Sequence, residues 1–197
     1  MLRIISLLIF LSVTSSAQTL EEFGRQMSFF YKAPSKEAFL KFQNNADKHQ
    51  KAFKSTKNGA DILVALMIAR ISEENDWPII SKSFGEKAKE ILEGNSKLAK
   101  YINDPARVDP GKLDMWWASY FATGNEIYLE KIFTYVGENP KEAPSRLIMV
   151  YGAASWSFKA NCRQHKSVYD FAQNKLNKNK FHSYKTNFLK SCLEEKK

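Results

Sequence analysis

The sequence has few of the residues that are typical of β-sheet proteins or of folds held together by several disulfides. Among its 197 residues are eight glycines, six prolines and two cysteines. No run of β-branched residues alternates with polar ones, and no Asn-Gly or Asp-Gly pair joins two such runs as a hairpin turn would. Most glycines and prolines stand instead where helices would begin or end. We therefore expect an all-α fold.

The motifs of several enzyme classes are also missing. The three histidines, His49, His165 and His182, form neither a His-Glu-x-x-His motif nor a His-x-His pair, which argues against a zincin-type metal site. The sequence contains no Gly-x-Ser-x-Gly elbow and no glycine-rich phosphate loop. We expect no metal and no cofactor, and the catalytic residues, if the chain has any, stay unknown.

An acidic cluster has two readings. Glu73, Glu74 and Asp76 stand together between two predicted helices. They would suit a general acid or a calcium ion, but the oxygen spacing of a calcium loop is missing. We therefore favour helix-end charges in solvent.

Long hydrophobic runs are absent, and the longest unbroken one covers residues 62–69. Spanning a bilayer takes about 20 apolar residues, so we expect no transmembrane segment. The N-terminus carries Arg3, an apolar stretch over residues 4–13 and small residues up to Ala17. This pattern predicts a signal peptide over residues 1–17, with a buried N-terminal helix or a membrane anchor as the alternatives. The residue directly after Ala17 is not a cysteine, so a lipobox is not indicated.

The predicted product is a single all-helical domain over residues 18–197, exported to the periplasm or secreted. In an oxidising compartment two cysteines often pair, so we expect a disulfide between Cys162 and Cys192. It would close a loop of about 30 residues and stabilise the fold by roughly 3 to 4 kcal/mol in the chain-entropy model. Two buried free thiols are the alternative, and a Cys162 nucleophile with His165 as its base is the least favoured reading.

The net charge of +9 is concentrated at the C-terminus. Residues 159–197 hold ten Lys or Arg against three acids. Such a surface could contact an anionic polymer, a lipid surface or an acidic protein. A solvated lysine-rich face is favoured over these, because no arginine cluster or interleaved aromatic motif accompanies the charge.

The apolar pattern predicts helix pairs, in each of which an apolar helix precedes a more amphipathic one. The predicted pairs are 60–71 with 78–92, 112–123 with 126–136, and 145–159 with 163–176. Ala118 and Ala122 stand four apart, where small side chains let a neighbouring helix approach closely. Ala118 and Ala153 stand 35 residues apart, near the period of two-helix repeats.

Over residues 60–176 the chain thus resembles, in degenerate form, the tetratricopeptide and Sel1-like repeat proteins. The consensus spacing of Trp, Leu-Gly and Tyr is not met. The resemblance implies antiparallel helix pairs that pack as a short right-handed α-solenoid or an irregular helical domain. It further implies a curved scaffold used for protein binding, and nothing about catalysis.

The stretch MWWASYF, residues 115–121, gathers four aromatic side chains on one helix. Trp116 and Trp117 lie about 100° apart around the axis, so neighbouring helices must cover at least two sides. We interpret this helix as core, with Trp116 or Tyr120 at the edge of a groove. Trp156 is a similar case on the helix 145–159.

Two classes of function follow. The favoured one is an exported helical binding module that presents a groove between helix pairs to a protein or peptide partner. Residues 159–197 could add contact with an anionic surface. The alternative is a small secreted enzyme acting on an anionic or cell-wall polymer, which would need two carboxylates across a cleft.

Overall fold

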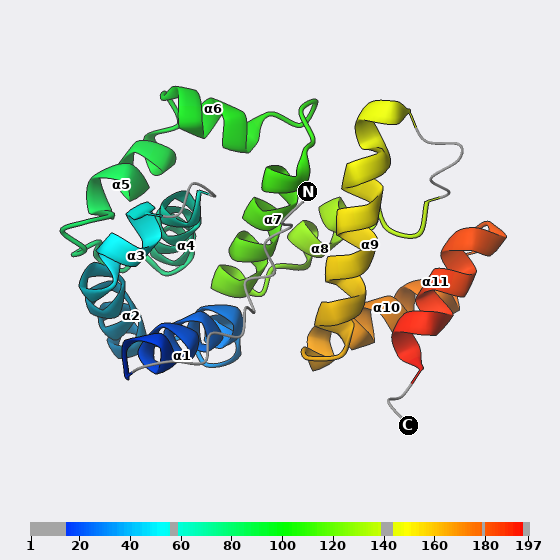
Figure 1. Ribbon diagram of the computed structural model, residues 1–197, viewed down its shortest axis with the longest axis horizontal. Coiled ribbons are helices and arrows are strands. Elements are labelled where there is room, and N and C mark those ends of the chain that lie inside the picture. Colours follow the sequence, from blue (N-terminus) through cyan, green and yellow to red (C-terminus); the bar gives the residue numbers. More distant parts are fainter. Residues whose placement is uncertain (1–14, 56–58, 139–143, 179, 195–197) are drawn as a thin grey trace. The chain divides into compact units, whose positions relative to one another are not determined.

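The structure is a computed structural model that describes residues 15–55, 59–138, 144–178 and 180–194 (Figure 1). Within these ranges the chain forms α-helices and two short 3-10 helices and no strand, so the all-α prediction is confirmed. No helix in the described ranges is long and apolar enough to cross a membrane. Most of the predicted signal peptide lies outside the described residues, and the prediction of export stays a prediction.

The described residues form two compact units. The N-terminal unit runs to Arg107 and adds residues 114–126, whereas the C-terminal unit comprises residues 108–113 and the chain from Ile127 onward. The prediction of a single domain over residues 18–197 stays a prediction. Of the predicted pairs, 112–123 with 126–136 is divided between the units.

The N-terminal unit is built around one helix that is apolar on nearly every side. Its helices are α1 Ser15–Phe29, η1 Phe30–Lys32, α2 Lys36–Lys48, α3 Gln50–Ser55, α4 Ala60–Asn75, α5 Gly85–Glu93, α6 Lys97–Asn103 and most of α7 Pro110–Thr123. Helix α4 packs against α2, α3 and α5 (Figure 1), and its residues 63–69 are all buried. A helix this apolar can be stable only when its neighbours cover it on several sides.

The predicted start of the helix 78–92 is wrong, because the segment between α4 and α5 is not helical up to residue 84. The sequence predicts a helix from Pro78, but α5 begins at Gly85. Side chains of α2 bind the backbone N–H groups of this segment: Gln43 Oε1 accepts from Ile80 and Ser81, at 2.7 and 3.0 Å. Farther along, Asp47 accepts from the backbone N–H groups of residues 82 and 83. A contact about 35 residues away in the chain therefore overrides the local proline signal.

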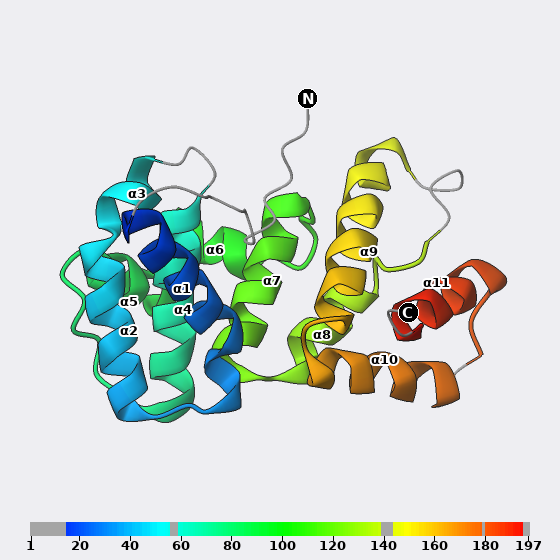
Figure 2. The same cartoon turned by 60° about the horizontal axis from the view of Figure 1, so that its bottom comes forward.

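The C-terminal unit is a group of helices around a cluster of phenylalanines. Its helices are most of α8 Glu126–Phe133, η2 Ser145–Leu147, α9 Ile148–Cys162, α10 Lys166–Lys178 and α11 Ser183–Leu193. Helices α9, α10 and α11 all contact one another (Figure 2). Phe133 lies against Phe158, Phe171 and Phe181, with ring centroids 5.6 to 5.9 Å apart. Of these rings, those of Phe133, Phe158 and Phe171 are buried, and a buried aromatic side chain removes about 150 to 250 Å² from water.

Candidate functional site

The tryptophan helix is core, as its sequence predicts. Trp116 is 9% exposed and Tyr120 is 1% exposed. Trp117 stacks on Phe121, with ring centroids 5.6 Å apart and planes 22° apart, and Tyr120 lies 5.1 Å from the ring of Tyr31. Burial leaves Trp116 and Tyr120 little surface to offer a partner, and their role at a groove edge stays a prediction.

Helix α9 presents the opposite case, because much of its apolar surface is exposed. Trp156 is 52% exposed, Met149 50% and Ile148 45%. With exposed Gly152 these residues follow a helical spacing that places them along one side of α9. We call Ile148, Met149, Gly152 and Trp156 the α9 face. Of the three residues that the sequence singles out for binding, Trp156 alone offers a large exposed ring.

Helix α9 is apolar on both its buried and its exposed side. The opposite side of the helix buries Val150, Ala153, Ala154 and Phe158 in the C-terminal unit. Polar residues would normally occupy the solvent side of such a helix. Instead α9 is apolar on both sides, and its own unit covers only one of them. Large exposed apolar side chains in a row mark interaction sites more often than single ones do.

Positive charges outnumber negative ones on α9 and in the C-terminal part of the chain. Helix α9 contains no acidic residue. Arg163, which directly follows α9 and stands seven residues after Trp156, is exposed and has no ion pair with any described residue. From residue 127 to the C-terminus the chain holds thirteen Lys or Arg against six acids. Glu130 and Asp170 are already engaged, by Lys175 and Lys166 respectively.

One of the lysines in this basic region is structural, which the sequence does not reveal. Lys185 on α11 is buried and donates to Glu138 Oε1 at 3.0 Å. Its Nζ also lies 4.5 Å from the ring centroid of Phe133, a distance that suits a cation–π contact. His182 approaches the other oxygen of the same carboxylate at 3.5 Å. Lys185 thus ties α11 to the chain after α8 and does not belong to a solvated face.

The two cysteines lie in contact as buried free thiols on α9 and α11. A hydrogen bond with Cys192 raises the pKa of the Cys162 thiol, and burial and the charge of Cys192 raise it further. Cys162 Sγ also lies 3.8 Å from the carbonyl oxygen of Val168, to which it donates. A raised pKa keeps the thiol protonated, which is the reverse of what a nucleophile needs. The disulfide between Cys162 and Cys192 stays a prediction.

The acidic cluster at the end of α4 serves local structure. Glu73 pairs with Arg70 at 2.7 Å. Asp76 ends α4 in the left-handed region, with φ of 55°. Across the described ranges, no group of three or more His, Cys, Asp or Glu side chains could hold a metal ion. Helix-end charge is the reading that these contacts favour.

Comparisons with known proteins find no match: no family model fits the sequence, and no curated protein and no solved structure is similar to it. The resemblance to tetratricopeptide and Sel1-like repeats therefore stays a prediction. Inference about function rests on the chain's own residues, and among these the α9 face is the candidate site.

Proposed function

We propose that the chain is an exported binding module and that the α9 face docks an acidic segment of a partner protein. The observation that carries the proposal is the row of exposed apolar side chains formed by Ile148, Met149 and Trp156. We place the contact here because Trp116 and Tyr120 are buried. Among the described residues, no observation favours the alternative of an enzyme acting on a polymer.

The apolar side chains of the face supply the affinity in this proposal. Complete burial of a large apolar side chain contributes about 1.5 to 3 kcal/mol. Trp156 and Met149 are each about half exposed, so covering them would yield roughly half that amount for each. Tryptophan is also the residue type that most often dominates the energy of protein interfaces.

Gly152 shapes the middle of the face. A Cβ atom at this position would meet nothing within 4 Å, so the helix surface there is open. Met149 and Trp156 stand on either side of it along the helix. A partner helix can therefore approach the backbone of α9 closely between these two side chains, as small residues permit at helix crossings.

Positive charge selects the partner in this proposal. Arg163 extends the face at its C-terminal end, and α9 itself contributes no carboxylate. Opposite charges across an interface favour encounter and exclude partners of the same sign. A second copy of this chain would bring the same positive region to the interface. An amphipathic helix with acidic flanks is the better fit.

The test uses a designed helical peptide with leucines on one face and glutamates on its flanks, and a matched peptide with lysines in place of the glutamates. We expect saturable calorimetric binding of the glutamate peptide and at least tenfold weaker binding of the lysine peptide. Met149→Glu should abolish binding of the glutamate peptide, because it places a carboxylate on the face. The control is Tyr184→Glu, since Tyr184 is 47% exposed in the same unit but lies on α11.

Two results would overturn the proposal. One is equal loss of binding in Met149→Glu and Tyr184→Glu, which would show that general charge and not the face decides. The other is a dimer in sedimentation that Met149→Glu dissociates, which would make a second copy the occupant.

A further inference from the structure

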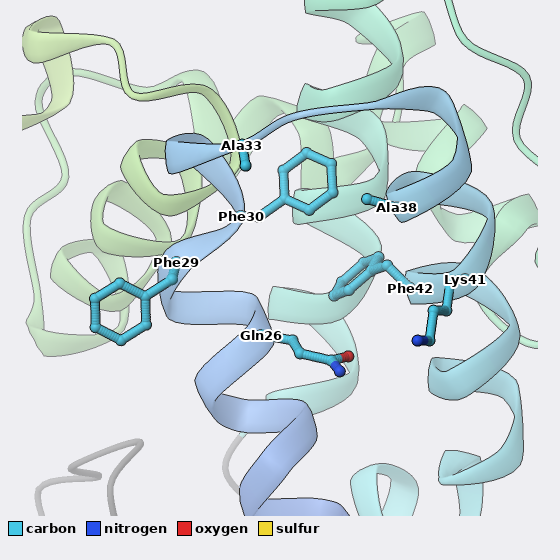
Figure 3. Close-up of a pocket in the computed structure, with 7 residues that line it drawn as sticks. All are labelled: Gln26, Phe29, Phe30, Ala33, Ala38, Lys41 and Phe42. Carbon is cyan, nitrogen blue, oxygen red and sulfur yellow. The ribbon is translucent and has the colours of Figure 1, made fainter.

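A cavity of about 310 Å³ opens between α1 and α2 in the N-terminal unit (Figure 3). It belongs to neither the α9 face nor the tryptophan helix. Seven residues line it: Gln26, Phe29, Phe30, Ala33, Ala38, Lys41 and Phe42. Pockets for small ligands span about 300 to 1,000 Å³, so this cavity fits only a small molecule.

One part of the cavity is apolar. The rings of Phe30 and Phe42 lie with centroids 6.2 Å apart and planes 56° apart, and both side chains are buried. Ala33 and Ala38 line the cavity beside the two rings (Figure 3). Their short side chains leave space where larger residues would fill the gap. This part can accept an alkyl or aromatic group.

The other part presents hydrogen-bond donors. Gln26 on α1 and Lys41 on α2 extend toward one another across the space between the helices (Figure 3). Neither side chain has a hydrogen bond or an ion pair with any described residue. The ammonium of lysine only donates, and the amide of glutamine donates through its NH₂ group. Together they suit an acceptor that carries negative charge.

No carboxylate lines the cavity to compete for Lys41. Figure 3 shows the Phe29 ring turned away from the other lining side chains, so the apolar surface is mainly that of Phe30 and Phe42. A compact apolar body with one anionic group matches both parts of the cavity.

We propose that this cavity binds a small apolar monocarboxylate, with its hydrocarbon against Phe30 and Phe42 and its carboxylate at Lys41 and Gln26. Lys41 is exposed, so water screens the charge pair and the apolar contact provides most of the affinity. The proposal does not depend on the α9 face, and either can fail without the other.

The test uses decanoate as the probe and decanol as its uncharged counterpart, both below their aggregation limits. We expect saturable binding of decanoate by calorimetry, with amide NMR shifts concentrated in residues 26–42. Lys41→Gln should weaken binding about fivefold, the effect of losing one exposed charge-assisted contact. The matched control is Lys48→Gln, because Lys48 is exposed on the same helix but does not line the cavity.

A second variant tests the apolar part. Ala38→Leu should fill the space beside Phe30 and Phe42 and reduce the affinity for decanoate more than tenfold, with the circular dichroism spectrum unchanged. The proposal is overturned if decanoate does not saturate at millimolar concentration, if decanol binds as tightly, or if folded Ala38→Leu binds like the parent. Equal weakening by Lys41→Gln and Lys48→Gln would also overturn it, since binding would then follow net charge alone.

Discussion

Replacing Gln43 with alanine should destabilise the N-terminal unit severely. The side chain is fully buried and makes three hydrogen bonds to the segment before α5: it accepts from the backbone N–H groups of Ile80 and Ser81 and donates to the carbonyl of Pro78 at 3.1 Å. Each such bond contributes about 1 kcal/mol net, and a buried N–H left without an acceptor costs a further 1 to 3 kcal/mol. The N–H of Ser81 is the buried one.

The sum for Gln43→Ala is about 4 to 6 kcal/mol, against a total stability of roughly 5 to 15 kcal/mol for a domain. Urea unfolding can measure this loss, and the midpoint is expected to fall by about 3 to 4 M for a slope near 1.5 kcal/mol per molar. Unfolding is followed by tryptophan fluorescence in a Trp156→Phe background. The remaining tryptophans, Trp77, Trp116 and Trp117, all lie in the N-terminal unit, so the signal reports on this unit.

Asn44→Ala provides the control for this measurement. Asn44 is exposed beside Gln43 on α2, and its replacement should change stability by less than about 0.5 kcal/mol. A loss below about 1 kcal/mol for Gln43→Ala would refute the reasoning. It would mean that water or local rearrangement satisfies the freed N–H groups, and that the segment before α5 does not depend on α2.

Three further predictions concern single sites. Partial burial raises the pKa of Asp47, but hydrogen bonds from residues 81–83 outweigh burial and hold this pKa below 3.8. The stability that the Asp47 carboxylate contributes is therefore lost as pH falls through its folded pKa. The urea midpoint of Asp47→Asn should fall less on acidification than the midpoint of the parent protein does. Gly137→Ala should lower the free energy of unfolding by about 2 kcal/mol or more, because Gly137 has φ of +63° and a Cβ would stand 3.0 Å from the backbone of α11. Gly94→Ala, with open space around it, should lower it by about 1 kcal/mol. Urea unfolding of each unit compares the two losses, and equal losses would contradict the clash. Cys162 and Cys192 should give no titratable thiol when the protein is isolated without reductant and then unfolded, and two titratable thiols would refute the disulfide.

The buried helices of the fold could be predicted from the sequence, because burial leaves a direct compositional signal. Residues 62–69 and the MWWASYF stretch are apolar on nearly every side of the helix, and all of their residues except Ile62 are buried in the structure. The start of α5 could not be predicted. Pro78 indicates a helix start locally, but Gln43 and Asp47 bind the backbone that follows it, and no local pattern records a contact across about 35 residues.

The candidate site could be predicted only in part, for a related reason. The sequence shows that 145–159 is apolar on most sides, and it therefore suggests a buried helix. Which side its own unit leaves uncovered depends on where α10 and α11 pack, and this follows from the phenylalanine cluster. Similarly, the basic C-terminus gave no sign that Lys185 is buried against Phe133.

Fluorine NMR of the chain labelled with 5-fluorotryptophan tests the central claim most directly, because each of its four tryptophans reports separately. The glutamate-flanked peptide should shift the resonance of Trp156 and protect it from solvent, while the buried Trp116 and Trp117 resonances stay in place. Saturable peptide binding that leaves the Trp156 resonance unmoved would contradict the assignment of the α9 face as the docking surface.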